Sequence, residues 1–119
     1  MSSSNGIPRV NRGFHSGDGI PCTLKDGRLA IPDTPVICYI EGDGIGREIG
    51  PPTRRLIDEA VKKISHNNRR ISWLRLYAGD DALDAYAERL PNDTLEAIRC
   101  YRLCLKGPLA TPVGTGHSS

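Results

Sequence analysis

The stretch Tyr39–Gly46, YIEGDGIG, follows the apolar run Val36–Ile40 and precedes a segment with helical spacing. Glycines between a strand and a helix are typical of loops that cradle phosphate groups. The dinucleotide fingerprint requires G-x-G-x-x-G, whereas the glycines here alternate and Arg47 stands where the third glycine belongs. No acidic residue ends the next strand either. The spacing therefore excludes that fingerprint and leaves open a tight turn that needs positive φ or a ligand-binding loop.

The residues around this turn predict a buried strand before it and a helix after it. Val36–Ile40 is continuously apolar, as expected for a strand buried on both faces. The pair at 51–52, both prolines, is expected in the first turn of the helix, and the segment 66–68 is expected to end it. One helix face carries Leu56, Ile57, Ala60, Val61 and Ile64, and the opposite face carries Arg54, Asp58, Glu59, Lys62 and Lys63.

The remaining segments predict an α/β fold in which an N-terminal β-hairpin precedes alternating strands and helices. Asp26-Gly27 lies between two short strand-like runs and suits a tight hairpin turn. Strands are expected over 71–77 and 102–106, with a short helix over 81–88. A further helix follows, with Asn92 or Asp93 as its N-cap. Alternating strands and helices favour a sheet with parallel pairs.

Composition limits the class of protein. The chain has 119 residues and a formal net charge of +2, with its basic residues spread along the sequence, which argues against a nucleic-acid-binding surface. No segment predicts a membrane span or a secretory signal. Residues 1–21 are rich in Ser, Gly, Asn and Pro and are expected to form a disordered arm; a transit peptide would need an amphipathic pattern that is missing. The four cysteines lack C-x-x-C spacing, so we expect reduced thiols in a cytoplasmic protein.

Two side-chain groups are candidates for a self-sufficient site. Asp80, Asp81, Asp84 and Glu88 form an acidic cluster, but no metal-binding loop accompanies it, so a solvated helix face is the favoured interpretation. The three histidines are scattered and have no nearby nucleophile in a suitable arrangement. The sequence therefore offers no catalytic residue and no metal ligand.

The glycine stretch resembles the amino-terminal signature of the β-decarboxylating dehydrogenases, the isocitrate and isopropylmalate dehydrogenase family. Residues 71–73, ISW, are similar to that family's second strand. Residues 106–116, KGPLATPVGTG, are similar to the loop that lies between cofactor and substrate in bacterial NADP-dependent isocitrate dehydrogenases. The resemblance runs in order over residues 22–116. It implies that residues 22–119 are the N-terminal part of that family's discontinuous large, cofactor-binding domain rather than a Rossmann fold.

The resemblance also implies functional residues. Ile45 occupies the position that packs against the adenosine part of NADP, although it could instead be a core residue. Ala110 and Thr111 fall in the loop beside the nicotinamide; bacterial relatives often carry Thr-Thr here, so Ala110 removes a hydroxyl and leaves backbone contact or Thr111. Ser119 falls at the position of a substrate-binding serine that is phosphorylated in some bacterial relatives, although His117 and Ser118 depart from the family pattern. Lys106 is expected to be a solvated lysine.

For the activity, the resemblance implies oxidative decarboxylation of isocitrate to 2-oxoglutarate with NADP in the tricarboxylic acid cycle. Mg²⁺ or Mn²⁺ would be held by ligands outside this chain, as would the catalytic residues, and the full-length enzyme would be a homodimer. The chain alone is expected to be inactive. The alternatives are a non-catalytic module that docks on a full-length dehydrogenase by supplying strands, a small nucleotide-binding domain, or a remnant without function.

Overall fold

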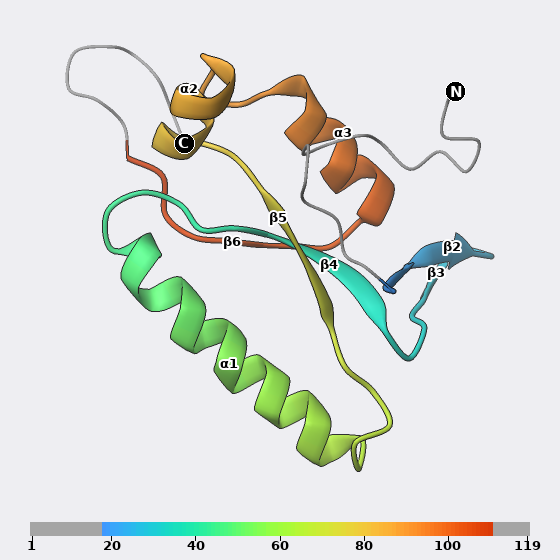
Figure 1. Cartoon of the computed structure of the whole chain (residues 1–119). Coiled ribbons are helices and arrows are strands. Elements are labelled where there is room, and N and C mark those ends of the chain that lie inside the picture. The colour runs from blue at the N-terminus through green and yellow to red at the C-terminus, as the bar shows by residue number, and fades with distance from the viewer. Residues whose placement is uncertain (1–17, 111–119) are drawn as a thin grey trace.

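The computed structural model describes residues 18–110, which form two helical layers around a small parallel sheet (Figure 1). The elements in chain order are β1 (Ile20–Pro21), β2 (Thr23–Lys25), β3 (Arg28–Ala30), β4 (Pro35–Ile40), α1 (Gly46–Ile64), β5 (Ser72–Leu76), α2 (Asp80–Tyr86), α3 (Asn92–Tyr101) and β6 (Cys104–Lys106). The predicted order of hairpin, strand, helix, strand, helix and strand is confirmed. So is the α/β class with parallel pairs.

β4 is the central strand of the sheet. It pairs in parallel with β5 from Val36 opposite Ser72 to Ile40 opposite Leu76. β5 fills one edge of β4, so β1 and β6 share the other edge: β1 pairs with its beginning and β6 with its end, where Cys38 is opposite Cys104. All these pairs are parallel, so the carboxyl ends of β4, β5 and β6 lie at the same edge of the sheet.

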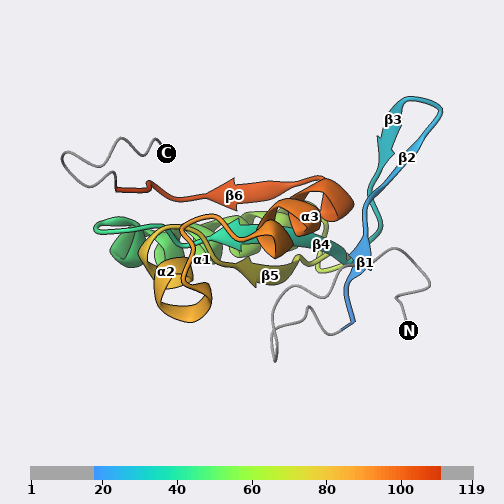
Figure 2. The same cartoon turned by 90° about the horizontal axis from the view of Figure 1, so that it is seen from above.

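The hairpin of β2 and β3 projects away from the sheet (Figure 2). Its antiparallel register joins Thr23 to Ala30 and Lys25 to Arg28. Asp26 and Gly27 both have positive φ, 53° and 75°, as the sequence predicted for this tight turn. The strands are exposed throughout, so the hairpin is held by its turn and ladder more than by packing.

Ordered structure begins earlier than the sequence suggested. Residues 18–21 lie in the segment expected to be a disordered arm, yet β1 is formed by Ile20–Pro21 and pairs with β4. Ile20 donates its backbone N–H to the Thr34 carbonyl at 2.9 Å, and Asp18 forms an ion pair with Arg70. The expected boundary at Cys22 is corrected because strand pairing supplies order that composition does not reveal.

The sheet separates α1 from α3, which lie on opposite faces in Figures 1 and 2. Alternate residues of β4 and β5 point to the α3 side and form the buried core. Its members are Val36, Cys38, Ile40, Leu74, Leu76, Ala78, Ala97 and Tyr101. The α1 side of the same strands is only half buried, at Ile37, Tyr39 and Trp73. β4 is therefore not sealed on both faces in the described residues, contrary to the expectation from its apolar run.

α1 begins at Gly46, five residues before the predicted start at Pro51. The turn before it provides the first bonds, since Gly46 donates to the Asp43 carbonyl at 2.9 Å and Arg47 to the Gly44 carbonyl at 3.2 Å. Pro51 and Pro52 therefore lie inside the helix. Each proline lacks an amide donor, but both lie near the N-terminal end of α1, where helix N–H groups lack partners in any case. The carbonyls left without a donor, those of Arg47 and Glu48, belong to exposed residues and can bind water.

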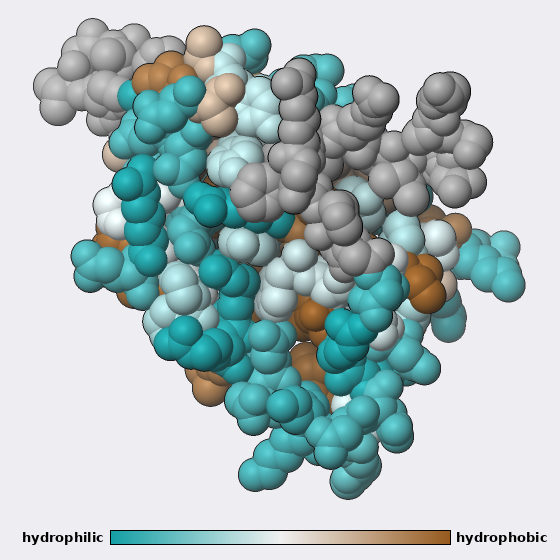
Figure 3. All heavy atoms as spheres, in the orientation of Figure 1, coloured by the Kyte–Doolittle hydropathy of each residue, from teal (hydrophilic) through white to brown (hydrophobic). Residues whose placement is uncertain are grey.

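The face that α1 turns toward the sheet was predicted only in part. Two residues assigned to the polar face are half buried: Arg54 stacks 3.8 Å from the centre of the Tyr39 ring, and Asp58 accepts a 2.9 Å hydrogen bond from Trp73 Nε1. Ile57 and Val61, which belong to the predicted apolar face, are also half buried. The apolar residues of the other stripe are exposed, namely Ile45, Ile49, Leu56 and Ile64. Figure 3 shows apolar atoms reaching the surface between hydrophilic ones.

Replacing Asp58 with alanine tests this orientation of α1. The substitution leaves the indole N–H of Trp73 without its acceptor in a half-buried position, so we expect a loss of about 1 kcal/mol in the free energy of unfolding. Trp73 is the single tryptophan, so urea unfolding and emission wavelength are both read from its fluorescence. Glu59→Ala is the control, because it removes the same charge from a side chain that is 72% exposed. Equal effects of both variants would contradict the assigned face.

The last two elements differ from the prediction at their ends. The N-cap of α3 is Pro91, and no side chain caps the helix, so neither Asn92 nor Asp93 acts as predicted. Thr94 instead ties the first turn to the end of β5 by donating to the Tyr77 carbonyl at 2.6 Å. Arg102 has a φ of 76° and ends α3, which delays β6 until Cys104. No helix within residues 18–110 is long and apolar enough to cross a membrane.

Candidate functional site

The candidate site lies at the carboxyl edge of the sheet, where the loops after β4, β5 and β6 meet. Ligands of parallel α/β sheets commonly bind at this edge. The loop after β4 is the glycine turn, the loop after β5 leads into α2, and the loop after β6 carries the Gly107-Pro108 pair. Backbone hydrogen bonds join the first and third loops directly: Asp43 donates to the Pro108 carbonyl at 2.7 Å, and Gly107 to the Ile40 carbonyl at 2.8 Å.

The glycines of this turn serve two different purposes. A Cβ at Gly42 would overlap the Pro108 carbonyl, and one at Gly46 would overlap the Glu41 carbonyl. Gly107 approaches the Glu41 carbonyl in the same way. Gly44 differs, because it has a φ of 53° and open space where its Cβ would lie. The predicted turn with positive φ is thus confirmed. Gly42 and Gly46 allow close packing against backbone carbonyls, whereas Gly44 has free space beside its backbone.

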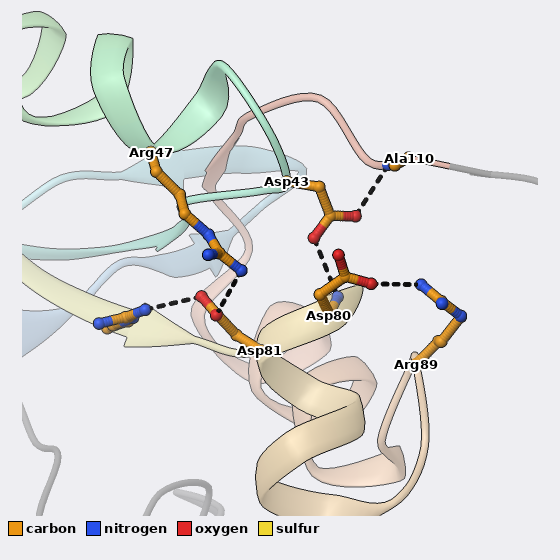
Figure 4. Close-up of polar contacts among 7 residues, drawn as sticks. Asp43, Arg47, Asp80, Asp81, Arg89 and Ala110 are labelled. Carbon is orange, nitrogen blue, oxygen red and sulfur yellow. Dashed lines mark hydrogen bonds and ion pairs between the residues drawn. The ribbon is translucent and has the colours of Figure 1, made fainter. Parts of the chain in front are cut away.

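Asp43 connects all three loops (Figure 4). Its side chain is 3% exposed. One carboxylate oxygen accepts a 2.9 Å hydrogen bond from the Asp80 amide, and the other accepts a 2.8 Å bond from the Ala110 amide. Sequence reasoning missed this residue. The sequence offered one signal, because Asp43 is an acidic residue between two glycines directly after a buried strand. A charge at such a position lies on neither a solvated helix face nor an exposed strand, so it needs hydrogen-bond partners.

The acidic cluster of α2 is engaged in ion pairs rather than solvated at its first two positions. Asp81 accepts from Arg47 at 3.0 Å and from Arg75 at 2.8 Å. Asp80 pairs with Arg89 at 2.9 Å (Figure 4). Only the later two acids of the cluster are exposed as predicted. Among residues 18–110, no group of three His, Cys, Asp or Glu side chains is placed to hold a metal ion.

Two of the residues predicted to bind cofactor lie on loops that Asp43 joins. Ile45 is 61% exposed at the N-terminus of α1, so it belongs to no core formed by the described residues. Ala110 is exposed in the loop after β6 and is joined to the glycine turn through Asp43. Lys106 is exposed, with its Nζ 3.0 Å from the Gly107 carbonyl. Thr111 and Ser119 lie outside the described residues, so their predicted roles stay predictions.

The thiols are free and mostly protected from solvent. Burial, with smaller contributions from Cys104 and Cys100, raises the pKa of Cys38 to about 12. Burial likewise raises the pKa of Cys104 to about 11, although Lys106 opposes the shift. Thiols with pKa values in this range are protonated at neutral pH, so they are poor nucleophiles and poor metal ligands.

The raised thiol pKa values predict a loss of stability at alkaline pH. Below the unfolded pKa of about 8.5, both states of Cys38 are protonated and the thiol favours neither. As pH rises from there toward 12, only the unfolded state releases its proton, so the free energy of unfolding falls. We expect a lower urea midpoint at about pH 10.5 than at about pH 8. In Cys38→Val this decrease should shrink; an unchanged decrease would show that other groups cause it.

The chain matches the family described as isocitrate/isopropylmalate dehydrogenase over residues 36–119. It is 46% identical over 103 residues to a protein of Haloferax volcanii named isocitrate dehydrogenase [NADP], covering 87% of this chain and 24% of that protein. It is 49% identical to the Nostoc sp. protein of the same name, covering 85% and 22%. The crystal structure of isocitrate dehydrogenase from Methylococcus capsulatus aligns with a TM-score of 0.53 and 41% identity, over 72% of this chain and 23% of that one.

A parallel sheet with three joined loops at its carboxyl edge defines an α/β protein. The family match covers more than half of the chain and includes all three loops. The chain therefore belongs to the isocitrate/isopropylmalate dehydrogenase family. It spans about a quarter of the length of the curated relatives that it matches.

Proposed function

We propose that this chain is the amino-terminal segment of the large domain of an NADP-dependent isocitrate dehydrogenase. The observation that carries the proposal is the 45–49% identity, over most of the chain, to several proteins named isocitrate dehydrogenase [NADP]. The family itself includes isopropylmalate dehydrogenases, so the family match alone does not choose the substrate. The whole enzyme would convert isocitrate to 2-oxoglutarate and carbon dioxide while reducing NADP.

In this proposal the chain contributes part of the NADP site. When bound, NADP would accept the hydride that isocitrate loses. Ile45 would supply an apolar surface for the adenosine end, and the open space at Gly44 would let the ligand approach the backbone. The loop from Ala110 to Thr111 would lie beside the nicotinamide. Ser119 would contact isocitrate, where phosphate on its hydroxyl would repel the substrate's carboxylates.

The divalent metal of the reaction does not fit the residues described. The half-buried acids Asp80 and Asp81 are paired with arginines, and the described side chains provide no group of three ligands. We therefore assign no step of the reaction to a metal held by this segment. Its ligands, and the groups that transfer protons, would belong to the remaining three quarters of the enzyme, which we propose to be a cytoplasmic homodimer.

A chimera tests the proposal. Residues 1–119 would replace the matching amino-terminal quarter of the Nostoc sp. protein, with which they share 49% identity. We expect isocitrate-dependent NADP reduction by the chimera with Mg²⁺, and none by the 119-residue chain alone. Isopropylmalate serves as the competing substrate. A chimera that folds, has the oligomeric state of the parent enzyme and is inactive with isocitrate would overturn the proposal. Activity of the 119-residue chain alone would contradict the expectation that this segment is inactive.

A second function is favoured by the surfaces that the described residues leave uncovered. β5 pairs only with β4 in this part of the chain, and the outer apolar stripe of α1 is exposed. The chain could therefore act without catalysis, by docking on an intact dehydrogenase subunit through strand addition. Co-expression with the tagged full-length subunit tests this. A stable complex that leaves catalysis to the subunit would support docking, and a free monomeric chain would count against it.

A further inference from the structure

We infer that Asp43 is a positioning residue that fixes the two cofactor-contact positions of this segment relative to one another. The contact positions are Ile45, at the start of α1, and Ala110, in the loop after β6. They are far apart in sequence and belong to different loops. The inference rests on the proposed function for its consequence, whereas the positioning itself is a property of this chain.

The geometry provides one carboxylate for two loops. Asp43 Oδ1 accepts from the Asp80 amide at 2.9 Å, and Oδ2 accepts from the Ala110 amide at 2.8 Å. The main chain of the same residue donates to the Pro108 carbonyl at 2.7 Å. Asp43 therefore holds the β6 loop at two places, before and after Leu109. A loop bound at two places has less freedom than one bound only at its strand end.

The surroundings of this position suit an aspartate. The side chain is 3% exposed, so each of its oxygens needs a hydrogen-bond donor, and hydrogen bonds to an ionised acceptor are the stronger class. Its partners are backbone amides, in contrast to Asp80 and Asp81, which pair with arginines. Gly79 completes the fit, because a Cβ there would lie 2.6 Å from Asp43 Oδ2. Asparagine would keep the shape but present an NH₂ group to one of the two amides.

The consequence for the proposed enzyme is a fixed spacing across the NADP site. Ile45 is two residues after Asp43 on the same turn. Thr111 is the next residue in sequence after Ala110, whose amide donates to the Asp43 carboxylate. Without the carboxylate, the backbone hydrogen bond from Asp43 to the Pro108 carbonyl would remain. The hydrogen bond that the Ala110 amide donates to Asp43, in the part of the loop proposed to lie beside the nicotinamide, would be lost. Binding of NADP would then have to order this loop, which lowers affinity.

Amide hydrogen exchange in the ¹⁵N-labelled 119-residue chain tests the positioning without any ligand. In the wild-type chain, the Asp80 and Ala110 amides should exchange far more slowly than the Gly27 amide of the exposed hairpin turn. In Asp43→Asn, at least one of the two should exchange about tenfold faster, while the Cys38 and Leu74 amides of the sheet core stay within about threefold. Asp58→Asn, which removes a charge elsewhere but keeps an acceptor for Trp73, should change neither loop amide.

Two results would overturn the inference. One is rapid exchange of the wild-type Ala110 amide, a measurement that needs no variant to fold. The other is unchanged protection of both loop amides in Asp43→Asn. In the Nostoc sp. chimera, the same substitution should raise the KM for NADP about tenfold with a smaller change in kcat. Equal KM and kcat values for the chimera with and without the substitution would show that Asp43 does not affect cofactor binding. An inactive parent chimera would refute the proposed function alone and leave the exchange result standing.

Discussion

Gly42→Ala should destabilise the chain by about 3 kcal/mol, which is an unusually large effect for the addition of one methyl group. Two costs combine at this position. The backbone has a φ of 87°, which strains any residue with a Cβ, and the new methyl group would overlap the Pro108 carbonyl. The collision is with backbone, so no side chain can rotate away to relieve it. The β6 loop would have to move, which also lengthens the hydrogen bond from Ala110 to Asp43.

Gly44→Ala is the matched control for this variant. Gly44 also has positive φ, 53°, but nothing lies within 4 Å of its added Cβ. Only the backbone strain remains, so we expect a loss of about 1 kcal/mol. Urea unfolding at neutral pH measures both losses. If the two variants lose the same free energy, the contact between the glycine turn and the β6 loop contributes nothing. The loops would then not be held together as described.

The second large effect should come from the sheet core. Leu76→Ala is expected to cost about 3 kcal/mol, because Leu76 is 1% exposed and lies at the end of β5 opposite Ile40 of β4. The neighbours belong to a strand that is paired on both edges, so they cannot easily collapse into the vacated volume. Thermal unfolding followed by circular dichroism measures the loss.

Leu56→Ala removes the same atoms from the outer stripe of α1. Leu56 is 72% exposed, so we expect a change within about 0.5 kcal/mol. The difference between the two losses in the free energy of unfolding shows whether the sheet core or the outer stripe of α1 stabilises the chain. A cost for Leu56→Ala close to that of Leu76→Ala would mean that the outer stripe of α1 is buried, either by an alternative packing of the helix or by association of chains in solution.

Sequence patterns predicted the elements of this fold better than they predicted which faces the elements bury. The hairpin turn at Asp26-Gly27 and the parallel strands followed from local rules. The helix after the glycine turn shows the limit, because its apolar residues form two adjacent stripes. Helical periodicity identifies both stripes but does not choose between them. The choice depends on partners in β4 and β5, where Tyr39 receives Arg54 and Trp73 donates to Asp58.

The candidate site shows the same division. Ile45 and Ala110 were proposed as contact positions because their motifs resemble those of a known family, and their roles stay predictions. Asp43 could not, because its function depends on two amides that are distant in sequence and become its neighbours only when three parallel strands end together. The start of α1 was missed for a related reason. The rule that proline favours the first turn was applied to Pro51, whereas the bonds of the glycine turn begin the helix earlier.

The position of β4 at the centre of the sheet has a consequence for the order of folding during synthesis. β4 is made early, yet its partners on the two edges come from β1 before it and from β5 and β6 well after it. Each later pairing must close a longer loop, so the sheet acquires its strands in sequence, with β6 last. Until Cys104–Lys106 has left the ribosome, the apolar run PVICYI keeps half of one edge unpaired. Between the synthesis of β4 and that of β6, the nascent chain thus exposes part of an apolar strand edge, which makes β4 a segment that chaperones would protect.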